Sequence, residues 1–229
     1  MIKHVPVITI DGPGGAGKGT IAQMLALDLG WNILDSGALY RTLAFLLEKK
    51  NMDFKSFISS REEMLKEFNV SFDVGIVGEP VKVFLQGRDI TEYVRTEEIA
   101  KETSKLASQP EIRDFIKPCQ KEFKRLPGLV ADGRDMGTVI FPNADLKIYL
   151  TASLKKRAKR RHTQLKRGDS KVNMRFLLKE LANRDKIDKE RKHSPLKPAK
   201  DSLVIDTSNL NPNGVIKEIK KMPFNFLKK

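Results

Sequence analysis

The sequence contains a single cysteine, Cys119, and has no hydrophobic run long enough to cross a membrane. One thiol excludes an intrachain disulfide and a zinc site built from several cysteines. Residues 1–9 are too short for a signal peptide and include Pro6, so we expect neither export nor membrane attachment. These absences predict a cytoplasmic protein.

Aromatic residues are also scarce, at 7% of the chain, whereas lysine and arginine outnumber aspartate and glutamate by 43 to 29. The formal net charge of +14 is compatible with nucleic-acid binding, because cations gain affinity by releasing the counterions of phosphates. The aromatic residues are not interleaved with the basic ones as platforms for stacked bases. We therefore assign the charge to a solubilising surface and to a site for polyanionic ligands, and expect no nucleic-acid partner.

The length of 229 residues allows one substantial core with a small inserted lobe. Apolar segments separated by helical patterns predict a parallel central sheet with helices on both faces. These segments are residues 5–10, 33–34, 129–131, 146–150 and 203–205. Aspartate lies at or beside the carboxyl end of four of them, at Asp11, Asp35, Asp132 and Asp206. Ligands of open α/β sheets bind at this edge, although for Asp11 and Asp206 we expect only helix capping or turn formation.

Residues 68–91 interrupt this alternation. Two strand patterns, 70–74 and 81–85, flank a glycine-containing loop and predict an antiparallel hairpin. The hairpin is too small to carry its own core, so we expect an insert of about residues 62–105 within one domain that covers residues 1–229.

Two helices are expected after the hairpin. The first covers residues 96–107 and the second residues 111–126. Pro118 lies inside the second, where a proline removes one helical hydrogen bond, so we expect a kink or a break there.

A glycine-rich segment, GPGGAGKGT, lies between the first predicted strand and a helix. Glycine at Gly12, Gly14, Gly15 and Gly17 lets backbone N–H groups close around phosphate oxygens, where side chains would collide. Lys18 at the start of the helix reaches the terminal phosphates. The alternative is a glycine-rich turn with an exposed lysine, but the flanking strand and helix favour a P-loop. The sequence therefore predicts nucleoside triphosphate binding.

This P-loop departs from the usual pattern at one position. Gly19 stands where serine or threonine normally follows the lysine, and Thr20 comes next. This departure leaves the phosphate cradle intact and weakens the case for direct coordination of Mg²⁺ by this hydroxyl. Asp132 resembles the carboxylate that holds magnesium through water. The expected nucleotide contacts are Gly12, Pro13, Gly14, Gly15, Ala16, Gly17, Lys18, Gly19 and Thr20.

One predicted helix has a buried face that becomes charged. Its apolar stripe consists of Met174, Leu177, Leu178 and Leu181. Further along, the same stripe carries Arg184, Asp188 and Arg191. Charges directed toward the core need anionic or polar partners, which a phosphate cleft would supply. The alternative is a solvent-exposed helix end with ordinary ion pairs.

Arg157, Arg160 and Arg161 form a second cationic cluster on another predicted helix. Gly168 and Asp169 predict a turn before the next helix. The segment is interpreted either as a mobile flap that closes over phosphates or as a solvated basic helix.

Three motifs carry a resemblance to a known family. ITIDGPGGAGKGT, together with LDSGALYR at residues 34–41 and LVADGRDMGTVIFP at residues 129–142, resembles the bacterial cytidylate kinases, and the resemblance runs from residue 6 to residue 208. It implies a three-layer P-loop NTPase fold, a monophosphate-binding insert where the hairpin is predicted, and a short lid at about residues 155–170. It also implies ATP as phosphate donor, with Mg²⁺.

The resemblance implies roles for individual residues. Those that would read cytosine are Ser36, Arg113 and Asp135. Those on the monophosphate would be Arg41, Arg134 and Arg191, and those around the ribose Ser104, Arg184 and Asp188. The expected catalytic set is Lys18, Asp132, Arg134, Arg184 and Arg191, with Arg157, Arg160 and Arg161 in the lid region near ATP.

The chemistry of the base supports its assignment. Asp135 can accept from the N4 amino group of cytosine, and Arg113 can donate toward the ring acceptors. Uracil would place its O4 acceptor against the same carboxylate, a buried mismatch that costs roughly 1–3 kcal/mol. The alternative for Asp135 is an ion pair with its neighbour Arg134, or a turn cap.

The implied reaction is reversible transfer of the ATP γ-phosphate to CMP or dCMP by a monomer whose partners are nucleotides. Two rival interpretations stay open. One is a P-loop kinase for another monophosphate or a small alcohol. The other is an RNA-binding or ribosome-associated protein in which the P-loop serves as a switch, which the net charge of +14 would favour.

Overall fold

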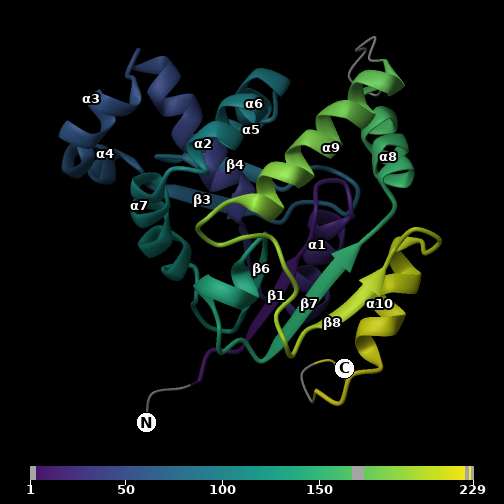
Figure 1. Ribbon diagram of the computed structural model, residues 1–229. Coiled ribbons are helices and arrows are strands. Elements are labelled where there is room, and N and C mark those ends of the chain that lie inside the picture. The colour runs from purple at the N-terminus through teal and green to yellow at the C-terminus, as the bar shows by residue number, and fades with distance from the viewer. Residues whose placement is uncertain (1–3, 167–172, 225–226, 228–229) are drawn as a thin grey trace.

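A computed structural model of the protein describes residues 4–166, 173–224 and 227. Its centre is a sheet of five parallel strands in the order β2-β6-β1-β7-β8 (Figure 1). The strands are β1 (Val7–Asp11), β2 (Asn32–Asp35), β6 (Leu129–Gly133), β7 (Leu146–Thr151) and β8 (Leu203–Asp206). The structure therefore confirms all five predicted strands, with ends that differ by one or two residues.

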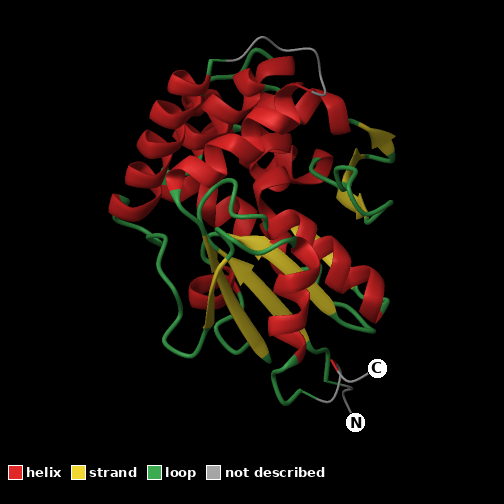
Figure 2. Cartoon of the chain, turned by 90° about the vertical axis from the view of Figure 1, so that its right-hand side faces the viewer, coloured by secondary structure: helices red, strands yellow, loops and turns green. Residues whose placement is uncertain are grey.

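Both faces of the sheet are covered by helices. Successive residues of a strand point to opposite faces, and the apolar strands therefore bury side chains on both. In β1, Val7 packs into one hydrophobic cluster and Ile8 into the other. The first cluster includes side chains of α2 (Ser36–Lys49) and α7 (Pro110–Lys121), and the second those of α1 (Lys18–Leu29) and α10 (Pro212–Lys220). Figure 2 shows the sheet in the lower part of the molecule with most of the helices above it. The predicted three-layer α/β architecture is confirmed.

The insert between α2 and α7 contains the predicted hairpin. The strands β3 (Val70–Asp73) and β4 (Lys82–Leu85) are antiparallel, with Val70 opposite Leu85. A third strand, β5 (Arg88–Asp89), was not predicted, because two exposed charged residues give no strand pattern. The other elements here are α3 (Phe54–Ser59), α4 (Arg61–Glu67), α5 (Thr91–Val94) and α6 (Glu97–Leu106). The proposed bounds of the insert, 62–105, stay a prediction.

The two helices expected after the hairpin are present. Thr96 caps α6 by accepting a hydrogen bond from the N–H of Ile99 at 3.2 Å. The helix α7 was predicted to kink or break near Pro118 and to extend to residue 126. It instead continues through Pro118 and ends at Lys121. Burial of Phe115 and Ile116 on its core face offsets the hydrogen bond that Pro118 cannot donate.

Four aspartates lie at the carboxyl edge of the sheet, as predicted. The register places Asp35 of β2 directly opposite Asp132 of β6. Asp11 accepts hydrogen bonds from the N–H groups of Met136 and Gly137, at 2.9 and 2.8 Å, and so caps the π-helical turn η1 (Met136–Ile140). Asp206 accepts from the N–H of Ser208 at 2.8 Å in a turn. The structural roles expected for Asp11 and Asp206 are confirmed.

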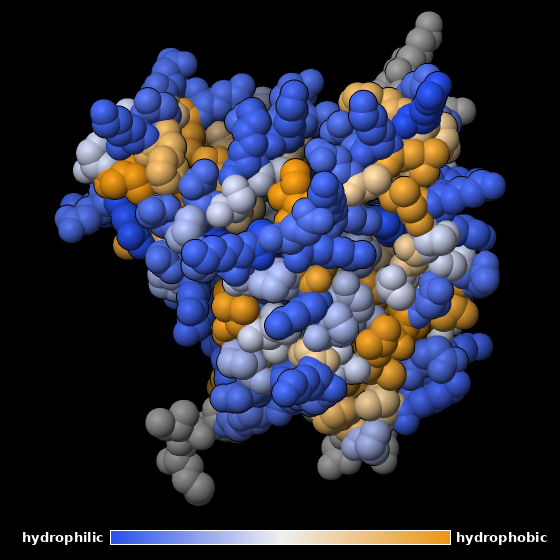
Figure 3. Space-filling model, in the orientation of Figure 1, coloured by the Kyte–Doolittle hydropathy of each residue, from blue (hydrophilic) through white to orange (hydrophobic). Residues whose placement is uncertain are grey.

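Two long helices, α8 (Leu154–Lys166) and α9 (Met174–Glu190), pack side by side (Figure 1). The turn predicted at Gly168 and Asp169 lies outside the described residues. Within the part of the chain that the structure describes, no helix combines the length and apolar character needed to span a bilayer. Hydrophilic residues cover most of the face in Figure 3, with hydrophobic residues in small separate groups.

The start of the glycine-rich loop is held tightly between two strands. Gly12 has a φ of +147°, and a Cβ there would lie 2.0 Å from the carbonyl oxygen of Leu150 in β7. We predict that Gly12→Ala lowers the free energy of unfolding by about 2–4 kcal/mol, because the β-carbon must displace backbone. Denaturant unfolding measures the change. Gly14→Ala is the matched control, since its Cβ would meet side-chain atoms only at 3.6 Å or more; equal losses in the two variants would contradict the prediction.

Candidate active site at the carboxyl edge of the sheet

Lys18 is the buried cation at the centre of the site. It begins α1, and its side chain is only 6% exposed. Its Nζ donates a hydrogen bond to the carbonyl of Pro13 at 3.3 Å and lies 3.7 Å from Oδ1 of Asp132. Burial, reinforced by the charge of Arg134, lowers the pKa of Lys18 to about 8. The lysine is thus held against its own loop, at the edge where the strands end.

Asp132 is the carboxylate of β6 that faces this lysine. Burial raises its pKa to about 6, against the opposing attraction of Lys18. A Cβ on Gly19 would lie 3.4 Å from Oδ2 of Asp132, so the glycine leaves open the space beside the carboxylate. Thr20, the next hydroxyl, is half-buried in the first turn of α1.

This donor set is compatible with Mg²⁺. Among the described residues there is no group of three or more His, Cys, Asp or Glu side chains arranged to hold a metal ion. Magnesium needs no such cage, because it is commonly held by one or two carboxylates, water and the phosphates of the substrate. One buried carboxylate with open space beside it matches that requirement.

The charged end of the α9 stripe lies against the sheet edge. Asp188 accepts a hydrogen bond from Nε of Arg134 at 2.9 Å, and Nη1 of Arg191 lies 3.9 Å from its other oxygen. Arg191 also donates to the carbonyl of Ser194 at 2.5 Å, while its Nη2 is buried without a hydrogen-bond partner among the described residues. Burial, together with the charge of Arg134, lowers the pKa of Arg184 to about 10. The stripe therefore directs three charges inward rather than to solvent.

The apolar part of this stripe is less buried than expected. Leu177 is buried, whereas the other three residues are half-buried: Met174, Leu178 and Leu181. On the inner face of α9, Leu177 is therefore shielded from solvent, whereas its apolar neighbours are only partly covered.

Two arginines extend the cationic surface toward the insert. Arg41 donates to the carbonyl of Val94 at 3.0 Å, and burial lowers its pKa to about 10. Arg95 donates to the carbonyl of Val81 and places Nη2 3.6 Å from Asp35, while its Nε is buried and has no partner in the described part of the chain. The sequence reasoning missed Arg95, because it stands alone after a short helix.

Two of the residues expected to read the base form a buried ion pair. Asp135, 3% exposed, pairs with Arg113 of α7, and the guanidinium of Arg113 lies 5.9 Å from the ring centre of Tyr40. The two alternatives for Asp135 do not hold, because Arg134 pairs with Asp188 and the carboxylate of Asp135 caps no turn.

Ser36 and Ser104 are placed differently. The buried Ser36 begins α2 and accepts a hydrogen bond from Nε2 of Gln120 at 2.8 Å. Ser104 is half-buried and donates to the carbonyl of Ala100 in its own helix, so it makes no hydrogen bond to Arg184 or Asp188. Gln120 was missed, although a polar residue seven positions after Arg113 on the same helix face is a signal that could have found it.

Two of the three arginines on α8 contact the backbone of the glycine-rich loop. Arg157 is buried, and its Nη1 donates to the carbonyl of Gly14 and to Asp185 of α9, both at 3.0 Å. Arg160 donates to Oγ1 of Thr207 at 2.9 Å and to the carbonyl of Ala16 at 3.3 Å. A solvated basic helix is therefore the wrong description for these two residues. Asp185 was missed, because its partner lies on another helix.

Arg161 points elsewhere in the site. It forms an ion pair with Glu97 at the start of α6. This pair links α8 to α6, two segments that are far apart in the sequence.

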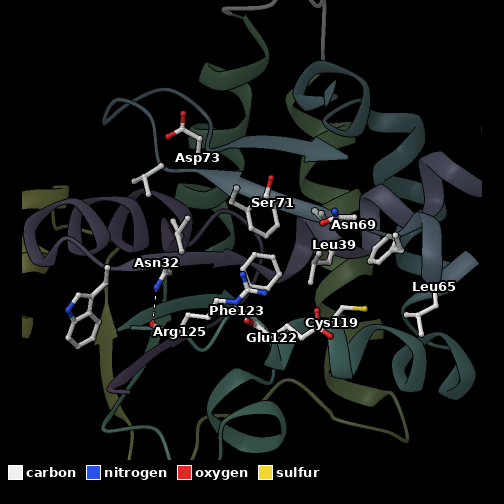
Figure 4. A pocket seen from close by; sticks show the side chains of 16 residues that line it. Asn32, Leu39, Leu65, Asn69, Ser71, Asp73, Cys119, Glu122, Phe123 and Arg125 are labelled. Carbon is white, nitrogen blue, oxygen red and sulfur yellow. Dashed lines mark hydrogen bonds between the residues drawn. The ribbon is translucent and has the colours of Figure 1, made fainter. Parts of the chain in front are cut away.

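The structure also contains a cavity of about 570 Å³ away from these residues (Figure 4). It lies between the start of β2, the strand β3 and the end of α7, and none of the predicted site residues lines it.

Comparison with known proteins shows the family to which the chain is related. The family model described as cytidylate kinase matches residues 8–223. A cytidylate kinase of Stutzerimonas stutzeri is 48% identical over 223 residues, which cover 96% of this chain and 95% of the relative. A cytidylate kinase of Nitrosococcus oceani is 45% identical over 219 residues, covering 96% of each.

Among solved structures, TT1252 from Thermus thermophilus aligns with a TM-score of 0.44 and 17% identity, over 97% of this chain and 100% of that one. This likeness is too distant to bear on the assignment, which depends on the family model and the two relatives. A parallel sheet whose first strand leads through a glycine-rich loop into the helix of Lys18 is a P-loop NTPase fold. The chain belongs to the cytidylate kinase family.

Proposed function

We propose that the protein transfers the γ-phosphate of ATP to CMP or dCMP, giving ADP and CDP or dCDP in pyrimidine nucleotide metabolism. The observation that carries the proposal is the buried Arg113–Asp135 pair, which lies at the same sheet edge as Lys18. A carboxylate and a guanidinium side by side match the amino donor and ring acceptors of cytosine. The 45–48% identity to cytidylate kinases supports the same substrate.

The reaction needs no covalent enzyme intermediate. An oxygen of the CMP phosphate attacks the γ-phosphorus in line, and ADP leaves. Lys18, Arg134 and Arg191 neutralise the charge on the phosphate oxygens, and their fixed positions spare the cost of reorganisation in the transition state. A general base is dispensable, because the phosphate is already largely ionised near neutral pH.

The backbone N–H groups of residues 12–20 hold the ATP phosphates, with Arg157, Arg160 and Arg161 alongside. Asp132, through water, and Thr20 would hold Mg²⁺, which when bound supplies a Lewis acid for the phosphate oxygens. Arg41 binds the CMP phosphate, while Ser104, Arg184 and Asp188 surround the ribose. Movement of the lid and the insert would exclude water, so that ATP is not hydrolysed.

We also propose that the enzyme is a cytoplasmic monomer whose partners are nucleotides. The single cysteine agrees with a reducing compartment. The small, separate hydrophobic groups on the face in Figure 3 agree with a monomer.

Replacement of Lys18 tests the phosphate site. We predict that Lys18→Ala lowers kcat at least about 100-fold, because one preorganised cation is lost from the transition state. A coupled assay of ADP formation measures the rate, and circular dichroism checks the fold. Lys50→Ala is the control, since Lys50 pairs with Glu67 at the surface; near-normal turnover in Lys18→Ala would remove this residue from the mechanism.

Replacement of Asp135 tests base recognition. We predict that Asp135→Asn reduces the ratio of kcat/KM for CMP to that for UMP by at least about tenfold, because an amide can donate to O4 of uracil. Asp201→Asn, which alters an exposed ion pair with Lys147, should leave the ratio unchanged. If the ratio also survives in Asp135→Asn, the base is read by other residues.

The raised pKa of Asp132 makes a prediction about stability. The pKa of this carboxyl is about 6 in the folded state, above its ordinary 3.8. Its ionisation therefore destabilises the folded protein as the pH rises from about 4 to 6. We therefore expect Asp132→Asn to raise the free energy of unfolding at pH 8 by about 3 kcal/mol while impairing activity. The gain should vanish near pH 4, where the acid is neutral in both states.

Denaturant titrations at the two pH values measure this gain. Asp28→Asn, at an exposed ion pair with Lys220, is the control and should show no comparable increase. A loss of stability at pH 8 in Asp132→Asn would show that attraction to Lys18 outweighs the cost of burial.

A further inference from the structure

Gln120 is a buried polar residue without an evident structural reason. It lies on the core side of α7 and is 1% exposed. Its Nε2 donates a hydrogen bond to Oγ of Ser36 at 2.8 Å, whereas its Oε1 is buried and has no partner among the described residues. A half-satisfied buried amide costs free energy that a methionine of similar size would not. Packing alone therefore does not account for this side chain.

Its place on α7 connects it to the base site. Gln120 follows Arg113 by seven residues, so both lie on one face of the helix, about 10 Å apart along its axis. Ile116, fully buried, lies between them on the same face. The face that presents Arg113 to Asp135 therefore also presents Gln120 to Ser36 at the start of α2.

The hydrogen bond fixes which way the hydroxyl of Ser36 acts. A serine hydroxyl has one proton to donate and two lone pairs that accept. Because Gln120 donates to Oγ, the hydroxyl of Ser36 accepts that bond and keeps its own proton for another acceptor. Ser36 can therefore act as a donor.

A hydroxyl donor that meets the base would distinguish the two pyrimidines. Cytosine presents an unprotonated N3 beside O2, whereas uracil carries a hydrogen on N3 and cannot accept there. We propose that Gln120 is a positioning residue that holds Ser36 as a donor and thereby increases the preference for cytosine over uracil. This inference rests on the proposed function, because it concerns discrimination within the same reaction.

A second buried glutamine supplies the matched control. Gln23 of α1 is 2% exposed, and its Nε2 donates to the carbonyls of Val74 and Ile76 at 2.6 and 2.9 Å. It ties α1 to the loop of the hairpin and touches no residue of the base cluster. Gln23→Met therefore removes a buried amide of structural character alone.

The test is a double-mutant cycle on Gln120 and Ser36. The ratio of kcat/KM for CMP to that for UMP is measured in the wild type, Gln120→Met, Ser36→Ala, the double variant and Gln23→Met, with the free energy of unfolding measured beside it. We expect Gln120→Met to reduce the ratio about tenfold. The double variant should match Ser36→Ala, since Gln120 acts through that hydroxyl. Gln23→Met should leave the ratio unchanged even where it lowers stability.

Two results would overturn the inference in an active wild-type background. One is an unchanged ratio in a folded Gln120→Met variant. The other is a double variant whose losses add, since Gln120 would then act independently of Ser36. If Gln120→Met does not fold, Gln120→Glu replaces it. A carboxylate of the same shape accepts the proton of Ser36, so the hydroxyl can offer the base only its lone pairs. An unchanged ratio in this variant would also overturn the inference.

Failure of the proposed function would look different. It would appear as a wild-type enzyme that forms no ADP in response to CMP, and the inference would fall with it. A wild type that prefers CMP, combined with a ratio insensitive to Gln120, would overturn the inference alone.

Discussion

Positive charge withdrawn from water at the carboxyl edge of the sheet is the constraint on which the rest of the structure depends. The side chains of Lys18, Arg134 and Arg191 are 6, 19 and 8% exposed, and the carboxylates of Asp132 and Asp188 lie within 4 Å of them. Burial lowers the pKa of Lys18 and of Arg191, so the charged forms are held at a cost. Phosphates would offset this cost, which is why the same groups that strain the free protein suit it to bind two polyanions.

The fold concentrates these groups because of the parallel register of its strands. All the strands of the central sheet end at one edge, where Asp35 lies opposite Asp132; Arg134 directly follows β6 there, and Lys18 begins the helix that follows β1. The helix α9 then adds Asp188 and Arg191 from above, through the pair of Asp188 with Arg134. Residues that are more than 150 positions apart thus share one cationic surface.

Much of this arrangement could be predicted from the sequence, because it depends on local patterns. Apolar strand segments and the glycine-rich loop determine the sheet and the position of Lys18, and the charged continuation of the α9 stripe predicted that Arg184, Asp188 and Arg191 face inward. The partner of Asp135 could not be predicted, because Arg113 comes from a helix 22 residues earlier in the chain and only the tertiary packing brings the two together. The end of α7 was also misjudged, since burial of its core face outweighs the helix-breaking tendency of Pro118.

Calorimetric titration with CMP and with cytidine, at equal ionic strength, tests the central claim most directly. Both ligands carry the same base and ribose, and they differ only in the phosphate that the buried cations are expected to bind. The account predicts that CMP binds at least about 100-fold more tightly than cytidine, the gain of roughly 3 kcal/mol expected from charge-assisted hydrogen bonds to a phosphate. Equal affinity for the two ligands would contradict it, because the cationic edge would then play no part in substrate binding.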